Sequence, residues 1–350
     1  MAEPWVLVTG ASGFIGSRLV KLLVERGERV KAFVRPGSRL DHLKEYPADR
    51  VWVAFGDITV EHTVYRALAG CDRMYHVASV FRVGELRPET VLVPAVEGTR
   101  ATLTAALKRK LRKVVVTSSV AALGTSSRPE PMDEEHEFNN SDPEAYIQSK
   151  YQAQQVALDL VEAGLPAVIV QPTAVAGPGD WKPTPAGQSV LQCLARPRLV
   201  PRVEGGVSVV DVDDVARGHV LAMERGKVGQ CYLLGGENVT YDQYCDLLAQ
   251  MVGTTASGPK LSPGVVRAAG WLLETKARWL GGQALLTYKV ARDMAGHYHW
   301  ASSKKAEREL GYEHRPAVES LERSVRWYHE HGYLSPRTAW RVRVELGTAT

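Results

Sequence analysis

The chain is poor in cysteine, and its few cysteines form no recognisable pattern. Four cysteines are scattered over 350 residues, without a CxxC motif or a nearby cysteine–histidine pair. This spacing disfavours both a disulfide framework and a zinc site, so we expect no metal and interpret the cysteines as packing residues. The N-terminal residues also lack the basic, apolar and cleavage regions of an export signal. We therefore expect a cytoplasmic protein.

The chain also has no large excess of positive or negative charge, and it has no long apolar run. The 43 Lys and Arg residues are interspersed with 39 Asp and Glu residues, for a formal net charge of +4 at pH 7. Without a basic patch, we do not expect the chain to bind nucleic acid. Charged residues interrupt the apolar segment that holds Trp271, Leu272, Trp279 and Leu280, which excludes a membrane span there. These apolar residues could still indicate contact with a membrane, but we favour a helix that packs its apolar side on the body of the protein.

Short apolar runs alternate with helical patterns through the first half of the chain. This alternation predicts an α/β fold with a Rossmann-like, doubly wound parallel sheet, which binds ligands at the carboxyl ends of its strands. After the first apolar run, Trp5–Val8, the predicted strands are Val30–Val34, Val51–Phe55, Met74–Val77, Val114–Thr117 and Ala167–Val170.

The pattern changes after residue 173, where Gly and Pro cluster before several helical segments. We expect a smaller, mainly helical substrate-binding region here, with strands at Val209–Val215 and Tyr232–Leu234 that return to the sheet. The last residues have no clear periodicity and are expected to fray. The predicted division is a dinucleotide-binding domain at 1–172 with returning segments around 207–236, a substrate-binding region at 173–335 and a C-terminal tail at 336–350.

The stretch Thr9–Gly16 joins the first predicted strand to a helical pattern through three glycines. The first allows a positive φ, the second lacks a Cβ that would block a pyrophosphate, and the third lets the helix lie close to its strand. An ordinary tight turn is the alternative, but a glycine turn in the first strand–turn–helix unit favours dinucleotide binding. The predicted contacts in this turn are Gly10, Ser12, Gly13, Phe14, Ile15 and Gly16.

The residues after the second strand bear on the choice of cofactor. An NAD site usually has Asp or Glu about twenty residues after the glycines, where it accepts from the ribose 2′-hydroxyl. This chain has Arg35 there and Arg39 shortly after it. Because arginine can bind a 2′-phosphate and an acid would repel it, we expect a preference for NADP(H), with NAD(H) possible. The alternative is that both arginines are solvated loop residues.

A tyrosine and a lysine four residues apart, Tyr146 and Lys150, lie in a helical pattern from about Asp142 to Glu162. This spacing places both side chains on one helix face, where the ammonium could lower the pKa of the phenol and bind ribose hydroxyls. Ser119, at the end of a strand, could then hydrogen-bond a carbonyl substrate. Alone, the pair would be an ordinary surface contact; the preceding glycine turn makes Ser119, Tyr146 and Lys150 candidate catalytic residues.

In these motifs the sequence resembles the extended short-chain dehydrogenases/reductases, from about Trp5 to Tyr333. Within that family it is most similar to the dihydroflavonol-reductase-like branch, which includes hopanoid-associated sugar epimerases. Three segments carry this closer match, namely Pro94–Thr99, Lys182–Gly187 and Leu233–Asn238. The resemblance implies cofactor contacts at Asp57, Ile58, Val77, Ala78, Ser79, Thr117, Ser118, Tyr146, Lys150, Pro172 and Thr173.

The resemblance implies a choice among three functions. Ala95 stands where many members have Asn, as in plant flavonoid and cinnamoyl reductases, and Ser208–Asp211 lacks the arginine that grips a sugar diphosphate. We therefore expect an NADPH-dependent reductase of an apolar ketone or aldehyde, with an epimerase and a catalytically silent NADP(H) sensor as alternatives. Family members commonly form dimers, and the expected apolar seam comprises Ala101, Leu103, Ala105, Ala106, Ala153, Val156, Ala157 and Leu160.

Overall fold

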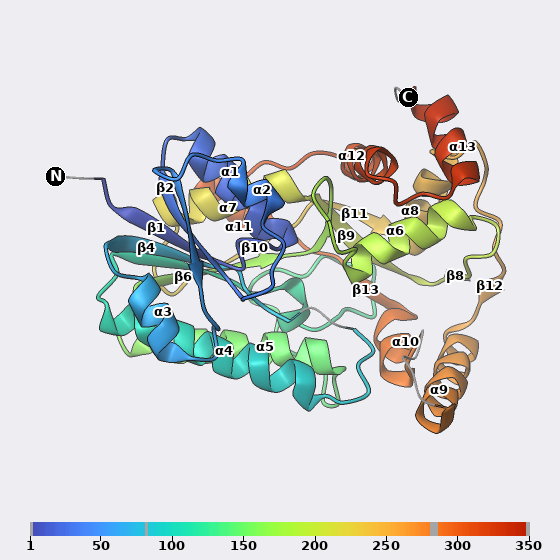
Figure 1. The fold of residues 1–350 in the computed structure, drawn as a ribbon. Coiled ribbons are helices and arrows are strands. Elements are labelled where there is room, and N and C mark those ends of the chain that lie inside the picture. The colour runs from blue at the N-terminus through green and yellow to red at the C-terminus, as the bar shows by residue number, and fades with distance from the viewer. Residues whose placement is uncertain (1–2, 81–82, 281–285, 348–350) are drawn as a thin grey trace.

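A parallel sheet of seven strands forms the centre of the computed structural model, which describes residues 3–80, 83–280 and 286–347 (Figure 1). Its strand order is β10-β6-β5-β4-β1-β2-β3, with every neighbouring pair parallel. The predicted Rossmann-like fold is therefore confirmed. The strands are β1 (Trp5–Thr9), β2 (Arg29–Val34), β3 (Val51–Phe55), β4 (Cys71–His76), β5 (Lys113–Thr117), β6 (Ala167–Pro172) and β10 (Cys231–Leu234).

The first strand shows why the sequence forms a sheet that is buried on both faces. Successive side chains of a strand point to opposite faces. Val6 and Val8 accordingly pack in one hydrophobic core cluster, whereas Leu7 packs in another. A continuous apolar run thus fills both cores, as in parallel sheets covered by helices on each side.

Helices cover both faces of this sheet (Figure 1). One face carries α3 (Glu61–Ala67), α4 (Glu89–Lys108) and α5 (Ala145–Glu162), and the last two pack along each other. The other face carries α1 (Phe14–Glu25), α2 (Asp41–Lys44), α7 (Val212–Arg225) and α11 (Lys304–Leu310).

A second, smaller region adjoins the carboxyl ends of the central strands (Figure 1). Its larger sheet has the order β11-β9-β13, with β7 also paired to β9, and its smaller sheet joins β8 and β12. Its strands are β7 (Ala174–Ala176), β8 (Arg202–Val203), β9 (Gly205–Asp211), β11 (Glu237–Thr240), β12 (Lys260–Leu261) and β13 (His297–His299). Its helices are α6 (Pro185–Ala195), α8 (Tyr241–Gln250), α9 (Pro263–Leu280), α10 (Tyr288–Met294), α12 (Ala317–Glu330) and α13 (Pro336–Leu346).

The strand predicted at Val209–Val215 differs from the one observed. β9 ends at Asp211, whose carboxylate accepts from the Asp213 amide at 2.8 Å and caps α7. β9 also pairs within the second sheet and does not return to the central one. The second predicted strand, Tyr232–Leu234, does return, as part of β10 beside β6.

The prediction that residues 337–350 fray is wrong for the part that the structure describes. Residues 336–346 form α13, whose first turn is capped by the Ser335 side chain and begins with Pro336. Val342 is fully buried and anchors the helix in a core cluster of the second region. Residues 348–350 lie outside the described residues.

Two predictions about apolar surfaces are also wrong. α9 does not bury the apolar residues that we assigned to the body, since Trp271, Leu272, Trp279 and Leu280 are all at least 59% exposed. Most of the proposed dimer seam is already buried inside one chain, because α4 and α5 pack against each other and on the sheet. The seam residues buried in this way are Leu103, Ala105, Ala106, Val156 and Ala157.

Candidate active site

The glycine turn between β1 and α1 has the close backbone approaches expected of a phosphate-binding loop. Gly10 has a φ of +67°, and a Cβ there would lie 2.8 Å from the Ala78 backbone. A Cβ on Gly16 would lie 2.1 Å from the Gly10 carbonyl oxygen, so this glycine makes room for the loop itself rather than for the strand. Gly13 caps α1 without a side-chain hydrogen bond, which leaves the first-turn amides to a ligand.

Thr9, which we did not predict, fixes the neighbouring loop against this turn. Its hydroxyl accepts from the amides of Val77 at 3.1 Å and Ala78 at 3.2 Å. It also lies 2.9 Å from Nδ1 of His76, whose pKa burial lowers to about 3, so the ring is neutral at pH 7. The predicted cofactor loop at Val77, Ala78 and the exposed Ser79 therefore lies directly beside Gly10.

The two arginines predicted to select NADP differ in their surroundings. Arg35 is exposed directly after β2. The Arg39 guanidinium forms an ion pair with Asp41 at 2.8 Å and lies 4.1 Å from the ring centre of Trp181. Arg39 is thus held by other partners.

Asp57 and Ile58 follow β3 at the same edge of the sheet. The Asp57 carboxylate accepts from the amide and the hydroxyl of Thr59, both at 2.8 Å. These hydrogen bonds, and more weakly the charge of Arg35, lower the pKa of Asp57, so the residue is ionised at neutral pH. Ile58 packs on α4, where a Cβ at Gly98 would come within 2.7 Å of the isoleucine side chain.

Ser119, Tyr146 and Lys150 come together at the carboxyl end of β5. Ser119 caps the short helix η1 (Val120–Ala122), and its Oγ accepts from the Ala121 amide at 3.2 Å. The Tyr146 hydroxyl donates to the same Oγ at 3.5 Å. Lys150, one turn further along α5, places its Nζ 5.9 Å from the centre of the Tyr146 ring. The three predicted residues thus form one cluster.

The electrostatics of this cluster differ from the prediction. Burial raises the pKa of Tyr146 to about 12, and the Ser119 hydrogen bond offsets only part of that effect. Burial also lowers the pKa of Lys150 to about 8. The expected lowering of the tyrosine pKa is therefore wrong here, because loss of solvent around the phenol dominates and the charge of Glu144 raises the pKa further.

Glu144 is a second residue that we did not predict, and it anchors the start of the tyrosine helix. Its carboxylate is buried and accepts from the amides of Tyr146 at 2.8 Å and Gly84 at 3.1 Å. Burial raises the pKa of Glu144, and the charge of Asp293 raises it further. The acid at the N-cap position, two residues before the tyrosine, was the available signal in the sequence.

Two hydroxyls predicted at the cofactor site are occupied by other protein groups. Ser118 Oγ donates to Gln154 Oε1 at 2.6 Å, and Gln171 donates to that same oxygen at 3.0 Å. Thr117 Oγ1 lies 2.8 Å from Nε2 of His219 on α7. These side chains hold α5 and α7 on the sheet, which leaves mainly their backbone groups for a ligand.

Thr173, beyond Pro172 at the end of β6, behaves differently. Its Oγ1 is buried and has no hydrogen-bond partner within residues 3–80, 83–280 and 286–347. Buried polar groups are normally satisfied, so an orphan hydroxyl at the ligand edge of the sheet is a mark of a binding site. Together with the glycine turn, Thr173 fits a bound dinucleotide.

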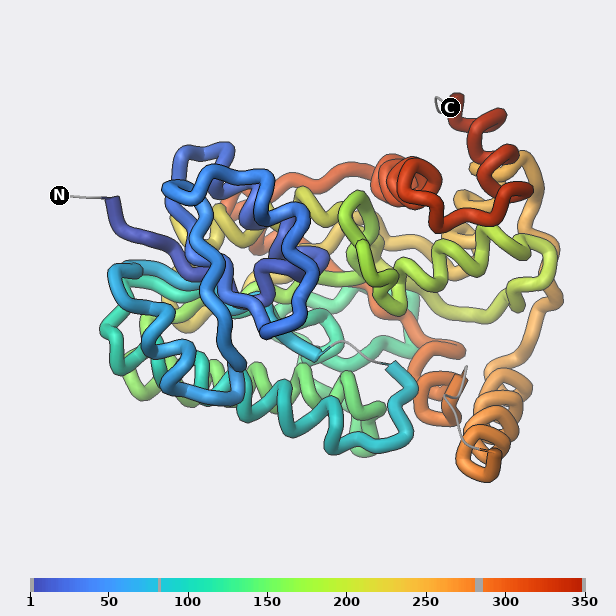
Figure 2. Tube along the Cα trace, viewed as in Figure 1, coloured from blue at the N-terminus to red at the C-terminus, as the bar shows by residue number. Residues whose placement is uncertain are grey.

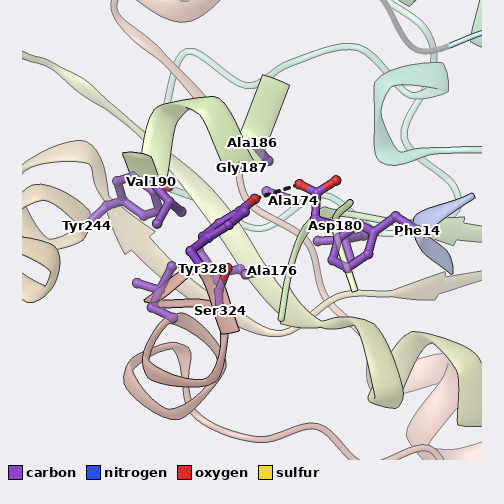
Figure 3. Close-up of a pocket in the computed structure, with 13 residues that line it drawn as sticks. Phe14, Ala174, Ala176, Asp180, Ala186, Gly187, Val190, Tyr244, Ser324 and Tyr328 are labelled. Atoms are coloured by element: carbon purple, nitrogen blue, oxygen red, sulfur yellow. Dashed lines mark hydrogen bonds between the residues drawn. The ribbon is translucent and has the colours of Figure 1, made fainter. Parts of the chain in front are cut away.

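A narrow cavity lies next to Phe14, the first residue of α1 after the glycine turn (Figure 3). There the Tyr328 hydroxyl donates to the buried Asp180 carboxylate at 2.8 Å. A Cβ on Gly187 would lie within 2.2 Å of both partners. This glycine therefore lets α6 approach α12 beside the cofactor turn.

The segment Val212–Val215, which resembles a late family motif, has a structural role. Asp213 forms ion pairs with Arg18 of α1 at 2.7 Å and with Arg323 of α12 at 2.5 Å. The buried Asp211 joins the same network through Arg323 at 2.9 Å. The motif thus fixes the helix that follows the glycine turn.

A Rossmann-like sheet with a glycine turn and a Ser-Tyr-Lys cluster at its ligand edge defines the extended short-chain dehydrogenases/reductases. The family model "NAD dependent epimerase/dehydratase family" matches residues 6–235 of this chain. The chain belongs to this family, whose members bind NAD(P), and is an NAD(P)-dependent oxidoreductase.

Individual relatives span nearly the whole chain. A putative dihydroflavonol 4-reductase of Synechocystis is 35% identical over 335 residues, covering 93% of this chain and 95% of the relative. A 4-hydroxy-2-methyl-3-oxo-4-farnesyl-3,4-dihydroquinoline-1-oxide ketoreductase of Stigmatella aurantiaca is 30% identical over 314 residues, covering 87% and 90%. The crystal structure of gox2253 superposes with a TM-score of 0.83 at 38% identity and covers 95% of this chain and 100% of that chain.

Proposed function

We propose that this protein is an NADPH-dependent reductase of an apolar ketone or aldehyde. The observation that carries the proposal is the cluster of Ser119, Tyr146 and Lys150 at the same edge of the sheet as the glycine turn. In this assignment residues 1–172 hold the cofactor, together with α7 and β10, which return to the central sheet. Residues 173–335 hold the substrate.

Each member of the cluster has a separate task. When bound, NADPH supplies a hydride to the carbonyl carbon. The Tyr146 hydroxyl gives its proton to the carbonyl oxygen, so that the product is an alcohol and the tyrosine is left as phenolate. Ser119 donates a hydrogen bond to that oxygen as negative charge develops on it. The Lys150 ammonium binds the ribose hydroxyls and stabilises the phenolate.

An epimerase would use the same three residues, so the cluster does not decide between the two activities. The reductase is supported by relatives whose names are those of reductases. It is also supported by Ser208 on β9, where nucleotide-sugar enzymes carry an arginine. Ser208 is fully buried, and its hydroxyl accepts from the Gly236 amide at 3.2 Å, which suits packing better than diphosphate binding.

Net consumption of cofactor tests the proposed reaction. A panel of apolar ketones and aldehydes, assayed by the loss of NADPH absorbance, should contain at least one compound that is turned over. Nucleotide sugars, run in parallel, should give no turnover. Interconversion of a nucleotide sugar without net loss of NADPH would support the epimerase, and NADPH binding without turnover of any carbonyl would support the sensor.

Arg35→Ala is expected to remove a preference for NADP(H) over NAD(H). An arginine–phosphate hydrogen bond is charge-assisted, but Arg35 is exposed, so we expect a preference of about tenfold in the wild type. Calorimetric titration of both cofactors measures this ratio. Arg39→Ala is the matched comparison and should change the ratio less, because Asp41 and Trp181 already hold Arg39. Equal affinities in the wild type would refute the assignment.

We also infer a two-fold homodimer formed through α4 and α5, with a seam that keeps Ala101 of the one first expected and adds Val93. The outward side of α4 presents Val93, which is 53% exposed, and Ala101, which is half-buried. An isologous contact would pair this side with its own copy. Light scattering at micromolar concentration should give twice the chain mass, and Val93→Glu should lower it. A monomeric mass for the wild type would contradict the inference.

A further inference from the structure

Helix α9 carries an apolar face that the protein leaves exposed. Val265, Leu272 and Trp279 are 52%, 60% and 85% exposed. They are spaced seven residues apart, which is nearly two helical turns, so they lie on one side of the helix. Exposed apolar side chains in a row mark an interaction surface more often than isolated ones do.

The side of α9 that packs on the protein is a different one. α9 lies beside α10 at the end of the molecule farthest from the N-terminus (Figures 1 and 2). A Cβ at the buried Gly270 would lie 2.7 Å from the Thr287 carbonyl oxygen and 2.9 Å from the Ala291 side chain. The exposed row therefore lies on a different side of α9 from the side that packs on the protein.

Positive charge surrounds this helix, and Lys276 lies one turn from both Leu272 and Trp279, whereas Arg267 and Arg278 lie away from the apolar row. α9 holds three exposed cations, Arg267, Lys276 and Arg278, and one carboxylate, Glu274. Glu274 is already paired with Arg278 at 2.7 Å and accepts from the Tyr288 amide at 3.0 Å. The unbalanced cations suit an anionic partner.

We propose that α9 docks this protein on the surface of an anionic lipid bilayer. A helix with tryptophan and leucine on one face and Lys or Arg on its polar face lies in the bilayer interface, with its apolar side chains among the lipids. None of the helices in the described part of the chain is long and apolar enough to cross a membrane, so the contact is with the surface.

A second copy of the chain fits this face less well. An 18-residue helix is about 27 Å long and about 10 Å wide, which gives a footprint of roughly 270 Å². A stable protein interface usually buries about 800 Å² on each partner. α9 projects beside α10 and supplies too little area by itself, whereas a bilayer needs only the row of side chains.

The position of α9 links the docking surface to the candidate active site. A groove of about 610 Å³ is lined on one side by Trp271 and Thr275 of α9 and on the other by Glu144 and Ala145. The last two residues directly precede Tyr146. Docking would thus place the groove at the lipid surface, where an apolar substrate dissolves. The docking itself does not require the proposed reductase activity.

Co-sedimentation with lipid vesicles tests the proposal without a substrate. The full-length wild type should bind vesicles of equal parts phosphatidylglycerol and phosphatidylcholine. Binding should weaken on pure phosphatidylcholine and in high salt, because the cations contribute. The double variant Leu272→Glu/Trp279→Glu should bind anionic vesicles at least about a hundredfold more weakly, since each apolar side chain is worth about tenfold.

Trp52→Glu is the matched control. Trp52 is 60% exposed on the edge strand β3 of the central sheet, so its replacement removes another exposed tryptophan far from α9 and should leave vesicle binding unchanged. Circular dichroism and NADPH binding should be the same for all proteins. Absence of vesicle binding by the wild type, or equal binding by the double variant, would overturn the proposal. A loss of dimer mass in the double variant would show that a second copy covers α9, and would overturn it too.

Discussion

Tyr146→Phe is expected to lower turnover by at least about a hundredfold, the lower end for removal of a positioned acid. The phenylalanine ring keeps the packing of α5 and removes only the hydroxyl that donates to Ser119. Binding of NADPH should hardly change, because the assigned ribose ligand is Lys150. Steady-state kinetics on a carbonyl substrate, together with calorimetric titration of NADPH, measure the two effects separately.

Tyr151→Phe is the control for this change. Tyr151 lies on the same helix, and its ring stacks on Phe138 at 4.1 Å, a contact that phenylalanine would retain. This variant should keep nearly full turnover. If Tyr146→Phe keeps nearly full activity as well, the tyrosine has a structural role and the proposed proton transfer is wrong.

Lys150→Met is expected to reduce activity and at the same time to stabilise the cofactor-free protein. Turnover should fall by at least about a hundredfold, and NADPH affinity by about tenfold, because one ammonium serves both the phenol and the ribose. Burial lowers the pKa of Lys150 from 10.5 to about 8. At pH 7 the folded protein therefore holds a buried charge, which costs up to about 3 kcal/mol of stability. Methionine has a similar length and no charge.

The stability difference between Lys150→Met and the wild type should depend on pH. Since the pKa of Lys150 is lower in the folded state than in the unfolded state, the cost is fully present below about pH 8 and disappears as the pH rises towards 10.5. The stability advantage of Lys150→Met in urea unfolding should shrink over that window. Lys44→Met, at an exposed position, should show no such trend. A variant less stable than the wild type at pH 7 would contradict the account.

The sequence was sufficient for the family, the central sheet and the glycine turn, because each depends on local signals. An apolar run followed by glycines at fixed spacing predicts both a strand and the turn that follows it. Ser119, Tyr146 and Lys150 were found for a similar reason, since two of them share one helix face. The structure places these three in one cluster.

Features that depend on distant partners could not be predicted in this way. β9 pairs with β11 and β13, whose residues lie far from it in the chain. The sequence pattern therefore assigned β9 to the wrong sheet. The pKa of Tyr146 depends on burial, which spacing along a helix does not reveal. The tail helix α13 did have a local signal, since Ser335 and Pro336 form a common helix start, but its apolar positions are sparse.

The exposed face of α9 was missed for a different reason. Its pattern is amphipathic, and such a pattern usually indicates packing on the body of the protein. The small residue Gly270 lets α9 meet α10 on another side, which leaves Leu272 and Trp279 exposed. Only the structure distinguishes the two faces.

The stoichiometry of NADPH oxidised to alcohol formed tests the central claim most directly. It is measured with purified protein and an apolar ketone from the panel, by absorbance for the cofactor and by mass spectrometry for the product. We expect one molecule of alcohol for each NADPH consumed by the wild type. The Tyr146→Phe variant should show neither NADPH consumption nor alcohol formation on the same timescale. Product formed without net consumption of NADPH, or equal rates in the two proteins, would contradict a reductase that uses Tyr146 as its proton donor.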